Sequence, residues 1–305
     1  MADIIFIVGP TATAKTETSF LLAKHLKGEI ISCDSMLFYK EPEIIVSCPP
    51  DYMLKEIAHH FVGIISVKDT YNVFEYYCRA AEKIEELYKK DIAVTVCGGS
   101  GLYIKALLDG IFSGAGKDEQ LRKKLEERAR IDGSEVLFNE LQKHDPAASE
   151  KISPNDTRRI VRALEVYYSS AIPISKQQEK AEGLYNKLPI RVFGLRLPKA
   201  ELYQRINKRT EEMFAQGAVN EVKNLLNYDL SLTAQKIIGI KEIKGYLDGK
   251  YDLDAAKEAM KRNTRRFAKR QTTWFKKDKR IEWIDIDKFS AQDIKSEILK
   301  RISHK

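Results

Sequence analysis

The chain has 305 residues, enough for one large domain or two smaller ones, and its composition is that of an ordinary globular protein. Its formal net charge of +8 favours an anionic partner, and its four cysteines are too scattered for a zinc site or a disulfide framework. No apolar run is long enough to cross a bilayer and no signal peptide is evident, so we expect a cytoplasmic, monomeric protein with no membrane partner.

The first predicted element is an apolar strand over 3–8, which leads through a small-residue loop into a helix over 15–27. The loop nearly matches the phosphate-binding pattern G-x-x-x-x-G-K-[ST], with Ala14 in place of the second glycine. If the loop needs a positive φ at that position, alanine costs about 1 kcal/mol or more. The pattern predicts a site for a diphosphate or nucleotide formed by Gly9, Pro10, Thr11, Ala12, Thr13, Ala14, Lys15 and Thr16, with a magnesium ion (Mg2+) on the Thr16 hydroxyl.

Two further strands are predicted over 29–32 and 92–96, separated by an irregular segment over 36–62 and an amphipathic helix over 72–90. The first ends at Asp34 and the second runs into a glycine-rich turn. Repeated strand–helix–strand units predict an α/β fold, a P-loop-type parallel sheet core flanked by helices. In such sheets the loops at the carboxyl ends of the strands carry the chemistry.

The strand over 92–96 does not end in the aspartate with which P-loop hydrolases and kinases hold magnesium. This absence argues against nucleotide hydrolysis. It favours a site for a substrate whose pyrophosphate is bonded to carbon and is the leaving group of the reaction. An acceptor would then need a base, and Asp34 is the only carboxylate in the three predicted turns.

A charged, entirely helical segment follows the core, and we expect a helical insertion domain over 116–186. The core is then formed by 1–115 and 187–305, with a strand over 190–195 and a short strand over 281–284. Helices are predicted over 199–217, 218–227, 234–248 and 253–277. The helix over 253–277 is densely basic with almost no interleaved acids, which favours an anionic polymer as partner.

Several strings, in order across nearly the whole chain, resemble the tRNA dimethylallyltransferase family of the bacterial type. Examples are Gly9-Pro10-Thr11-Ala12, Asp34-Ser35-Met36, Gly98-Gly99-Ser100-Gly101-Leu102-Tyr103, Arg162-Ala163-Leu164-Glu165-Val166 and Gly239-x-Lys241-Glu242. The resemblance implies transfer of a dimethylallyl group from dimethylallyl diphosphate to the N6 amino group of the adenosine 3′-adjacent to the anticodon in tRNA.

The resemblance also implies residue roles. Asp34 is expected to be the general base, and Ser100 stands where the family has a threonine that hydrogen-bonds near the reacting centre. The loop holds the diphosphate, with magnesium at Thr16 as the cofactor site. The insertion is expected to contact tRNA, and the implied tRNA-binding residues are Asp34, Ser35, Met36, Leu37, Arg122, Arg158, Arg159, Arg162, Lys236, Gly239 and Lys241.

Departures from the family pattern keep alternatives open. Ala14 replaces a glycine, Leu37 replaces a common glutamine, and 45–49 replaces the usual G-T-A-K-P. The alternatives are an adenine-nucleotide prenyltransferase, a catalytically weakened tRNA-binding paralogue and a P-loop kinase that uses ATP. For Arg158 and Arg162, the alternative role is an ion pair with Glu165 and its neighbours.

Overall fold

The computed structural model describes residues 3–112 and 118–303. The chain divides into two compact units, one that runs to Leu108 and resumes at Leu184, and a second that comprises Asp109–Gly183. The insertion expected over 116–186 overlaps the second unit, and its expected start at 115/116 lies outside the described residues. Within the described ranges, no helix is both long and apolar enough to span a bilayer.

The first unit is built on a parallel sheet with the strand order β3-β2-β4-β1-β5-β6. The central strand β1 pairs with β4 on one side and with β5 on the other, and Ile4 lies opposite both Val94 and Ile190. This sheet confirms the predicted α/β class. The strand bounds are Ile4–Val8 for β1, Glu29–Ser32 for β2, His59–His60 for β3, Val94–Gly98 for β4, Ile190–Arg196 for β5 and Ile281–Asp285 for β6.

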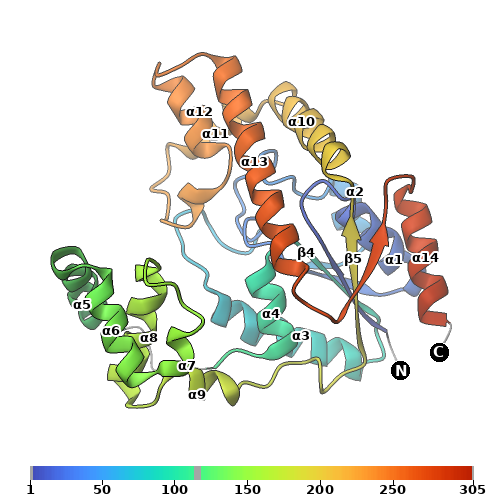
Figure 1. Cartoon of the computed structure of the whole chain (residues 1–305). Coiled ribbons are helices and arrows are strands. Elements are labelled where there is room, and N and C mark those ends of the chain that lie inside the picture. Colours follow the sequence, from blue (N-terminus) through green and yellow to red (C-terminus); the bar gives the residue numbers. More distant parts are fainter. Residues whose placement is uncertain (1–2, 113–117, 304–305) are drawn as a thin grey trace. The chain divides into compact units, whose positions relative to one another are not determined.

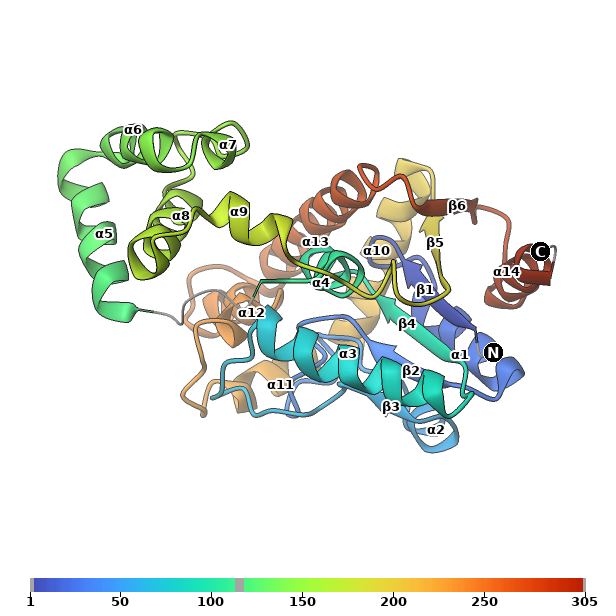
Figure 2. The ribbon, with the colours of Figure 1, turned by 90° about the horizontal axis from the view of Figure 1, so that it is seen from below.

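Helices cover both faces of this sheet (Figure 1; Figure 2). One face packs against α3 (Val73–Lys89) and α4 (Gly101–Asp109), and the other against α1 (Lys15–Leu26) and α14 (Ala291–Ser303). Side chains alternate along β1, so that Phe6 faces the first pair and its neighbour Ile7 the second. A strand buried on both faces must be apolar throughout, which is why 3–8 contains no polar residue after Asp3.

A second layer of helices follows β5. It contains α10 (Lys199–Ala215), α11 (Ala218–Leu225), α12 (Ile240–Leu247) and α13 (Leu253–Phe275), together with the short 3-10 helix η1 (Ala234–Lys236). Here α13 packs against α10 and α12. The continuous helix predicted over 234–248 is wrong, because η1 ends at Lys236 and α12 begins only after Gly239, whose φ of +114° is not helical.

The described part of the second unit is helical, as the sequence predicts for its insertion. Its helices are α5 (Glu119–Asp132), α6 (Ser134–His144), α7 (Pro146–Ser149), α8 (Thr157–Ser170) and α9 (Ile174–Glu179). They enclose a core in which Leu137, Leu141 and Leu164 are fully buried. Asp156 caps α8 by accepting a hydrogen bond from the Arg159 backbone at 3.2 Å.

Two parts of the first unit differ from the prediction. The segment predicted to be irregular contains α2 (Asp51–Glu56) and the edge strand β3. The chain also ends in α14, where no helix was predicted. Ile294 and Ile298 of α14 are buried against the sheet.

Candidate active site at the carboxyl ends of the strands

The loops after β1, β2 and β4 meet at one edge of the sheet. The Cys33 backbone N–H donates to the Cys97 carbonyl at 2.7 Å, and the Ser35 N–H donates to Ser100 Oγ at 3.1 Å. Gln271 of α13 joins the loop after β1 to the turn after β4. Loops that are far apart in the sequence therefore form one cluster, as expected for a parallel sheet.

The loop after β1 has the backbone of an anion-binding turn. Gly9 has a φ of +144°, and a Cβ there would lie 2.6 Å from the Leu195 carbonyl oxygen, so only glycine fits. Ala12 and Ala14 lie in the left-handed region with φ of +64° and +56°. The loop does require a positive φ at Ala14, and alanine is strained there by about 1–2 kcal/mol. Thr13 Oγ1 donates to the Pro10 carbonyl at 2.8 Å and closes the turn.

Lys15 follows this loop as the first residue of α1. Its ammonium donates to the Pro10 carbonyl at 2.6 Å. Loss of surrounding water lowers the pKa of Lys15 to about 8, and the nearby Arg209 lowers it too, while Cys97 and Asp34 act in the opposite direction. A bound anion would favour the charged form of Lys15, so the side chain is poised for a negatively charged ligand.

Arg209 of α10 is a site residue that the sequence reasoning missed. Its guanidinium donates to Thr11 Oγ1 at 2.8 Å. Burial lowers the pKa of Arg209, while Asp34 raises it. An arginine at this place adds a fixed positive charge beside the loop. Its only sequence signal was its position between the buried Ile206 and Thr210 on a helix, which many solvated arginines share.

Asp34 is half-buried in the loop after β2. Its Oδ1 accepts a hydrogen bond from the Met36 N–H at 3.1 Å, and its carbonyl accepts one from the Leu37 N–H at 3.1 Å. Oδ2 of Asp34 has no hydrogen-bond partner within the described ranges. One oxygen therefore fixes the carboxylate, while the other is available to a ligand.

Ser100 lies beside this loop in the turn after β4. Its hydroxyl accepts from the Ser35 N–H and lies 3.4 Å from the Ser35 hydroxyl. The turn approaches closely because Gly98 has no side chain, since a Cβ there would lie 2.0 Å from the Cys33 carbonyl oxygen. The residues predicted to be catalytic, Asp34 and Ser100, thus flank the same backbone segment.

The predicted metal ligand Thr16 is half-buried, and its hydroxyl has no hydrogen bond within the part of the chain that the structure describes. Those residues also contain no cluster of three or more histidine, cysteine or acidic side chains that could enclose a metal. A single hydroxyl is nevertheless a donor set that suits Mg2+, which commonly keeps its waters and takes its other ligands from substrate phosphates.

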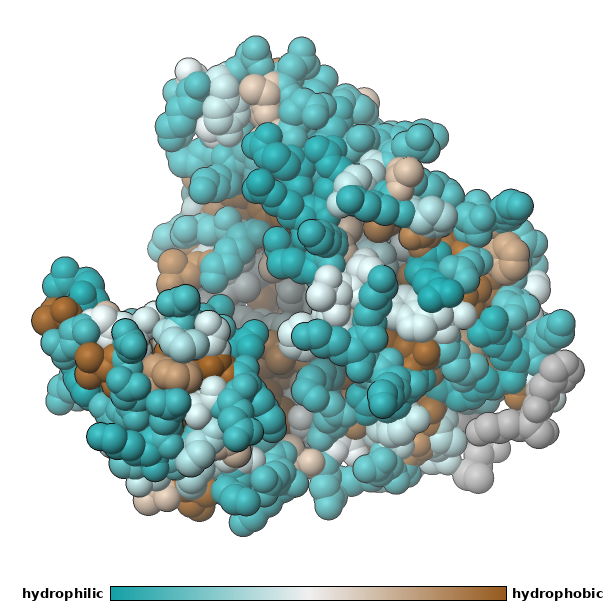
Figure 3. Space-filling model, viewed as in Figure 1, coloured by the Kyte–Doolittle hydropathy of each residue, from teal (hydrophilic) through white to brown (hydrophobic). Residues whose placement is uncertain are grey.

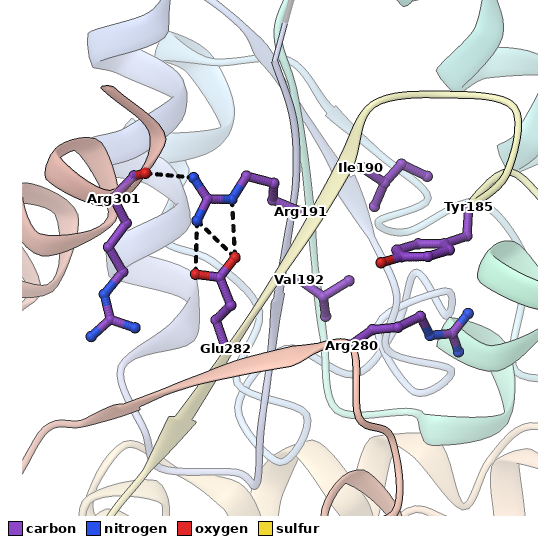
Figure 4. A pocket seen from close by; sticks show the side chains of 7 residues that line it. All are labelled: Tyr185, Ile190, Arg191, Val192, Arg280, Glu282 and Arg301. Carbon is purple, nitrogen blue, oxygen red and sulfur yellow. Dashed lines mark hydrogen bonds and ion pairs between the residues drawn. The ribbon is translucent and has the colours of Figure 1, made fainter. Parts of the chain in front are cut away.

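A separate cavity of ≈ 330 Å³ lies at the opposite end of the strands from the candidate site, near the amino ends of β5 and β6. Figure 4 shows Arg191 paired with Glu282 among the residues that line it. Arg191 contacts both carboxylate oxygens of Glu282 at 2.7 Å, and it also donates to the Arg301 carbonyl at 2.6 Å. Because the Arg191 guanidinium already has protein hydrogen-bond partners, the site at the carboxyl ends of the strands remains the better candidate for chemistry.

A family model described as IPP transferase matches residues 37–278. The chain belongs to the IPP transferase family. A tRNA dimethylallyltransferase of Natranaerobius thermophilus is 40% identical, covering 98% of this chain and 91% of the relative. One from Pelotomaculum thermopropionicum is 42% identical, with 94% and 92% covered. The resemblance stated from the sequence is confirmed.

Solved structures agree with this membership. The structure of a tRNA isopentenylpyrophosphate transferase from Bacillus halodurans superposes with a TM-score of 0.73 at 33% identity, covering 99% of this chain and 96% of that one. A eukaryotic dimethylallyltransferase acting on tRNA gives a TM-score of 0.82 at 25% identity, covering 100% of this chain and 80% of that one.

The arginines expected to bind tRNA in the second unit have different surroundings. Arg122 and Arg162 both bind Oε2 of the buried Glu165, at 2.6 and 3.0 Å, so each also holds the core of this unit together. Arg159 pairs with Asp156 at 3.1 Å. Arg158 is exposed and has no ion pair within the described ranges, which leaves its full charge available to a partner.

The remaining predicted contacts lie in the first unit, in the loop after β2 and around the start of α12. Gly239 donates its N–H to Glu242 at 2.8 Å, and the other oxygen of Glu242 accepts from the Asn263 amide at 2.6 Å. These two hydrogen bonds of Glu242 fix the turn between Lys236 and Lys241, whose side chains are exposed. Leu37 is half-buried beside Asp34 and has no polar group to offer an acceptor base.

Proposed function

We propose that this protein transfers a dimethylallyl group from dimethylallyl diphosphate to the N6 amino group of the adenosine 3′-adjacent to the anticodon in tRNA. The observation that carries the proposal is the convergence of a phosphate loop, a carboxylate and a serine hydroxyl at one sheet edge, in a chain of this family. Because the acceptor is tRNA, we infer that the reaction takes place in the cytoplasm.

The diphosphate end of the substrate is bound by the loop from Gly9 to Thr16. Its backbone N–H groups and the start of α1 attract the anion, and Lys15 and Arg209 add two positive charges. These charges stabilise the diphosphate as it leaves carbon. Thr16 would hold Mg2+, which when bound supplies further neutralisation of the leaving group.

Asp34 accepts the proton at the acceptor end. The N6 lone pair is delocalised into the adenine ring, so the nitrogen is a poor nucleophile until its proton begins to move to a base. The new N6–C1 bond forms as the C1–O bond to diphosphate breaks, and the N6 proton passes to Asp34. Ser100, held by the Ser35 N–H, orients the amino group. The adenosine must leave the base stack to reach this site.

The outer face of α13 supports a polymeric acceptor. Lys261 on this helix pairs with Glu211 and Glu258. Lys257 also pairs with Glu211 and with Asp254. The exposed cations along and just after the helix lack an acidic partner within the described ranges, and the surface over the helix is hydrophilic (Figure 3). Exposed, unpaired cations suit the phosphates of a nucleic acid, whose binding they make salt-dependent. They are Arg262, Arg266, Lys269, Arg270, Lys276 and Lys277.

The test of this proposal is a label-transfer assay with several acceptors. The protein is incubated with Mg2+ and dimethylallyl diphosphate labelled in its alkyl group, and with unmodified tRNA or AMP. We expect label on the tRNA and much less on AMP. Equal or preferential labelling of AMP would favour the nucleotide prenyltransferase, and tRNA binding without label would favour the weakened paralogue. A parallel incubation with labelled ATP tests the kinase alternative.

A further inference from the structure

Gln271 of α13 connects two loops of the candidate site. Its side chain is 5% exposed and lies between the loop after β1 and the turn after β4. Oε1 accepts the Thr11 N–H at 2.9 Å, and Nε2 donates to the Gly99 carbonyl at 2.9 Å. The two loops are thus linked through one amide, which uses its acceptor on one loop and a donor on the other.

The Ser100 turn also lies tightly against α13. A Cβ on Gly99 would lie 2.2 Å from Nε2 of Gln271, and a Cβ on Gly101 would lie 2.3 Å from the Trp274 ring. Gln271 and Trp274 are three residues apart on a helix and therefore share a face. The two glycines that flank Ser100 leave no gap between the turn and this face, so the position of the turn depends on α13.

Thr11 is held through its backbone N–H and through its hydroxyl. Its N–H donates to Gln271, and its hydroxyl accepts from Arg209. No other side-chain type of this length offers one acceptor and one donor without a charge, except a protonated glutamate. Ionised glutamate lacks the donor that the Gly99 carbonyl requires, and methionine, which has a similar length, offers neither hydrogen bond in useful strength.

We propose that Gln271 is a positioning residue that sets the distance between the diphosphate loop and the Ser100 turn. It acts through Thr11 and Gly99 and does not itself touch the reacting atoms. The inference rests on the proposed function, in which the leaving diphosphate lies in the first loop and the acceptor nitrogen lies beside Ser100. A change at Gln271 should impair the bond-forming step more than the binding of tRNA.

The experiment compares Gln271→Met and Gln271→Glu with wild type and with Thr272→Val. Thr272 is the next residue of α13, and its hydroxyl donates only to the Ala268 carbonyl in its own helix, so its substitution is a matched control. For Gln271→Met, we expect kcat at saturating substrates to fall about 10- to 100-fold, since misplacement of reacting groups by about 1 Å has effects of this size. The Kd for tRNA and the activity of Thr272→Val should stay at the wild-type level.

Gln271→Glu adds a pH readout that a purely structural role would not produce. A protonated glutamate can donate to the Gly99 carbonyl and accept the Thr11 N–H, whereas the ionised form cannot donate. The activity of Gln271→Glu relative to wild type should therefore rise as the pH falls from about 8.5 to about 6, since burial raises the pKa of a carboxyl group. Circular dichroism at each pH checks that the variant is folded.

Two results would overturn the proposal. One is a Gln271→Met protein with wild-type kcat, and the other is a Gln271→Glu pH profile parallel to that of wild type. Calorimetric titration with inorganic diphosphate separates this failure from a failure of the proposed function. If wild type binds diphosphate but labels no tRNA, the proposed function fails. Weaker diphosphate binding by Gln271→Met would then still support the link between Gln271 and the loop.

Discussion

Ala14 is the residue at which this chain departs most visibly from a phosphate-binding loop. The backbone still adopts the left-handed conformation that a glycine would favour there, with a φ of +56°, and Ala12 does the same at +64°. The loop is held in this shape by the closed turn between Thr13 and Pro10 and by the contacts of Thr11. The surrounding structure therefore imposes the conformation, and the cost appears as lost stability.

Replacing Ala14 with glycine should stabilise the protein. Relief of the left-handed strain should raise the free energy of unfolding by about 1–2 kcal/mol. The greater conformational freedom of glycine in the unfolded chain should lower it by about 0.5–1 kcal/mol. We expect the free energy of unfolding, measured by urea titration, to rise by about 0.5–1 kcal/mol.

Ala259→Gly is the matched control for that measurement. Ala259 lies inside α13, where glycine should cost about 1 kcal/mol. If Ala14→Gly destabilised the protein as much as Ala259→Gly, the strain assigned to Ala14 would be wrong.

At the scale of elements, α5 and α8 use their arginines in two ways. Arg122 and Arg162 satisfy one oxygen of Glu165, a carboxylate that is 1% exposed, whereas Arg158 has no acidic partner in the described chain. The sequence alone does not show which of Arg158 and Arg162 pairs with Glu165 and which is available to tRNA. They differ because Arg162 lies three residues before Glu165, within reach on the helix surface, whereas Arg158 lies about two turns away from it.

The two kinds of arginine should respond differently to substitution. Arg122→Ala should lower the free energy of unfolding by about 1–3 kcal/mol, because Glu165 loses a charged donor while it stays buried. Arg158→Ala should leave stability within about 0.5 kcal/mol of wild type. It should reduce the slope of log affinity for tRNA against log salt by about 0.7–0.9, the share of one phosphate contact.

Thermal unfolding and a salt series of binding titrations measure both effects. Arg158→Lys serves as the control that keeps the charge, and it should retain the wild-type salt slope. A salt slope that is unchanged in Arg158→Ala would remove Arg158 from the tRNA-binding residues.

Helix α13 illustrates what the sequence could and could not predict. Its dense positive charge was evident from residue types, and so were the helix and its approximate bounds. The role of Gln271 was not predictable, because a glutamine on a helix acquires its partners only when Thr11 and Gly99, which lie 260 and 172 positions away, are brought to it. Arg209 escaped prediction for the same reason.

At the scale of the whole molecule, the parallel sheet could be predicted because its strands are continuous apolar runs followed by small-residue turns. That pattern also predicts that Lys15, Asp34 and Ser100 lie at the same end of the strands. Elements with weaker signals were missed. β3 has only two residues, and α14 packs on the sheet through Ile294 and Ile298 in an otherwise charged segment.

The role of Asp34 as general base is tested by the single-turnover rate of dimethylallyl transfer to tRNA by Asp34→Asn. Asparagine keeps the shape of Asp34 and its hydrogen bond to Met36, but it cannot take the N6 proton. We expect a rate about 10²–10⁴-fold below wild type, with tRNA binding and folding retained. An Asp34→Asn protein that transfers the group at the wild-type rate would contradict that role.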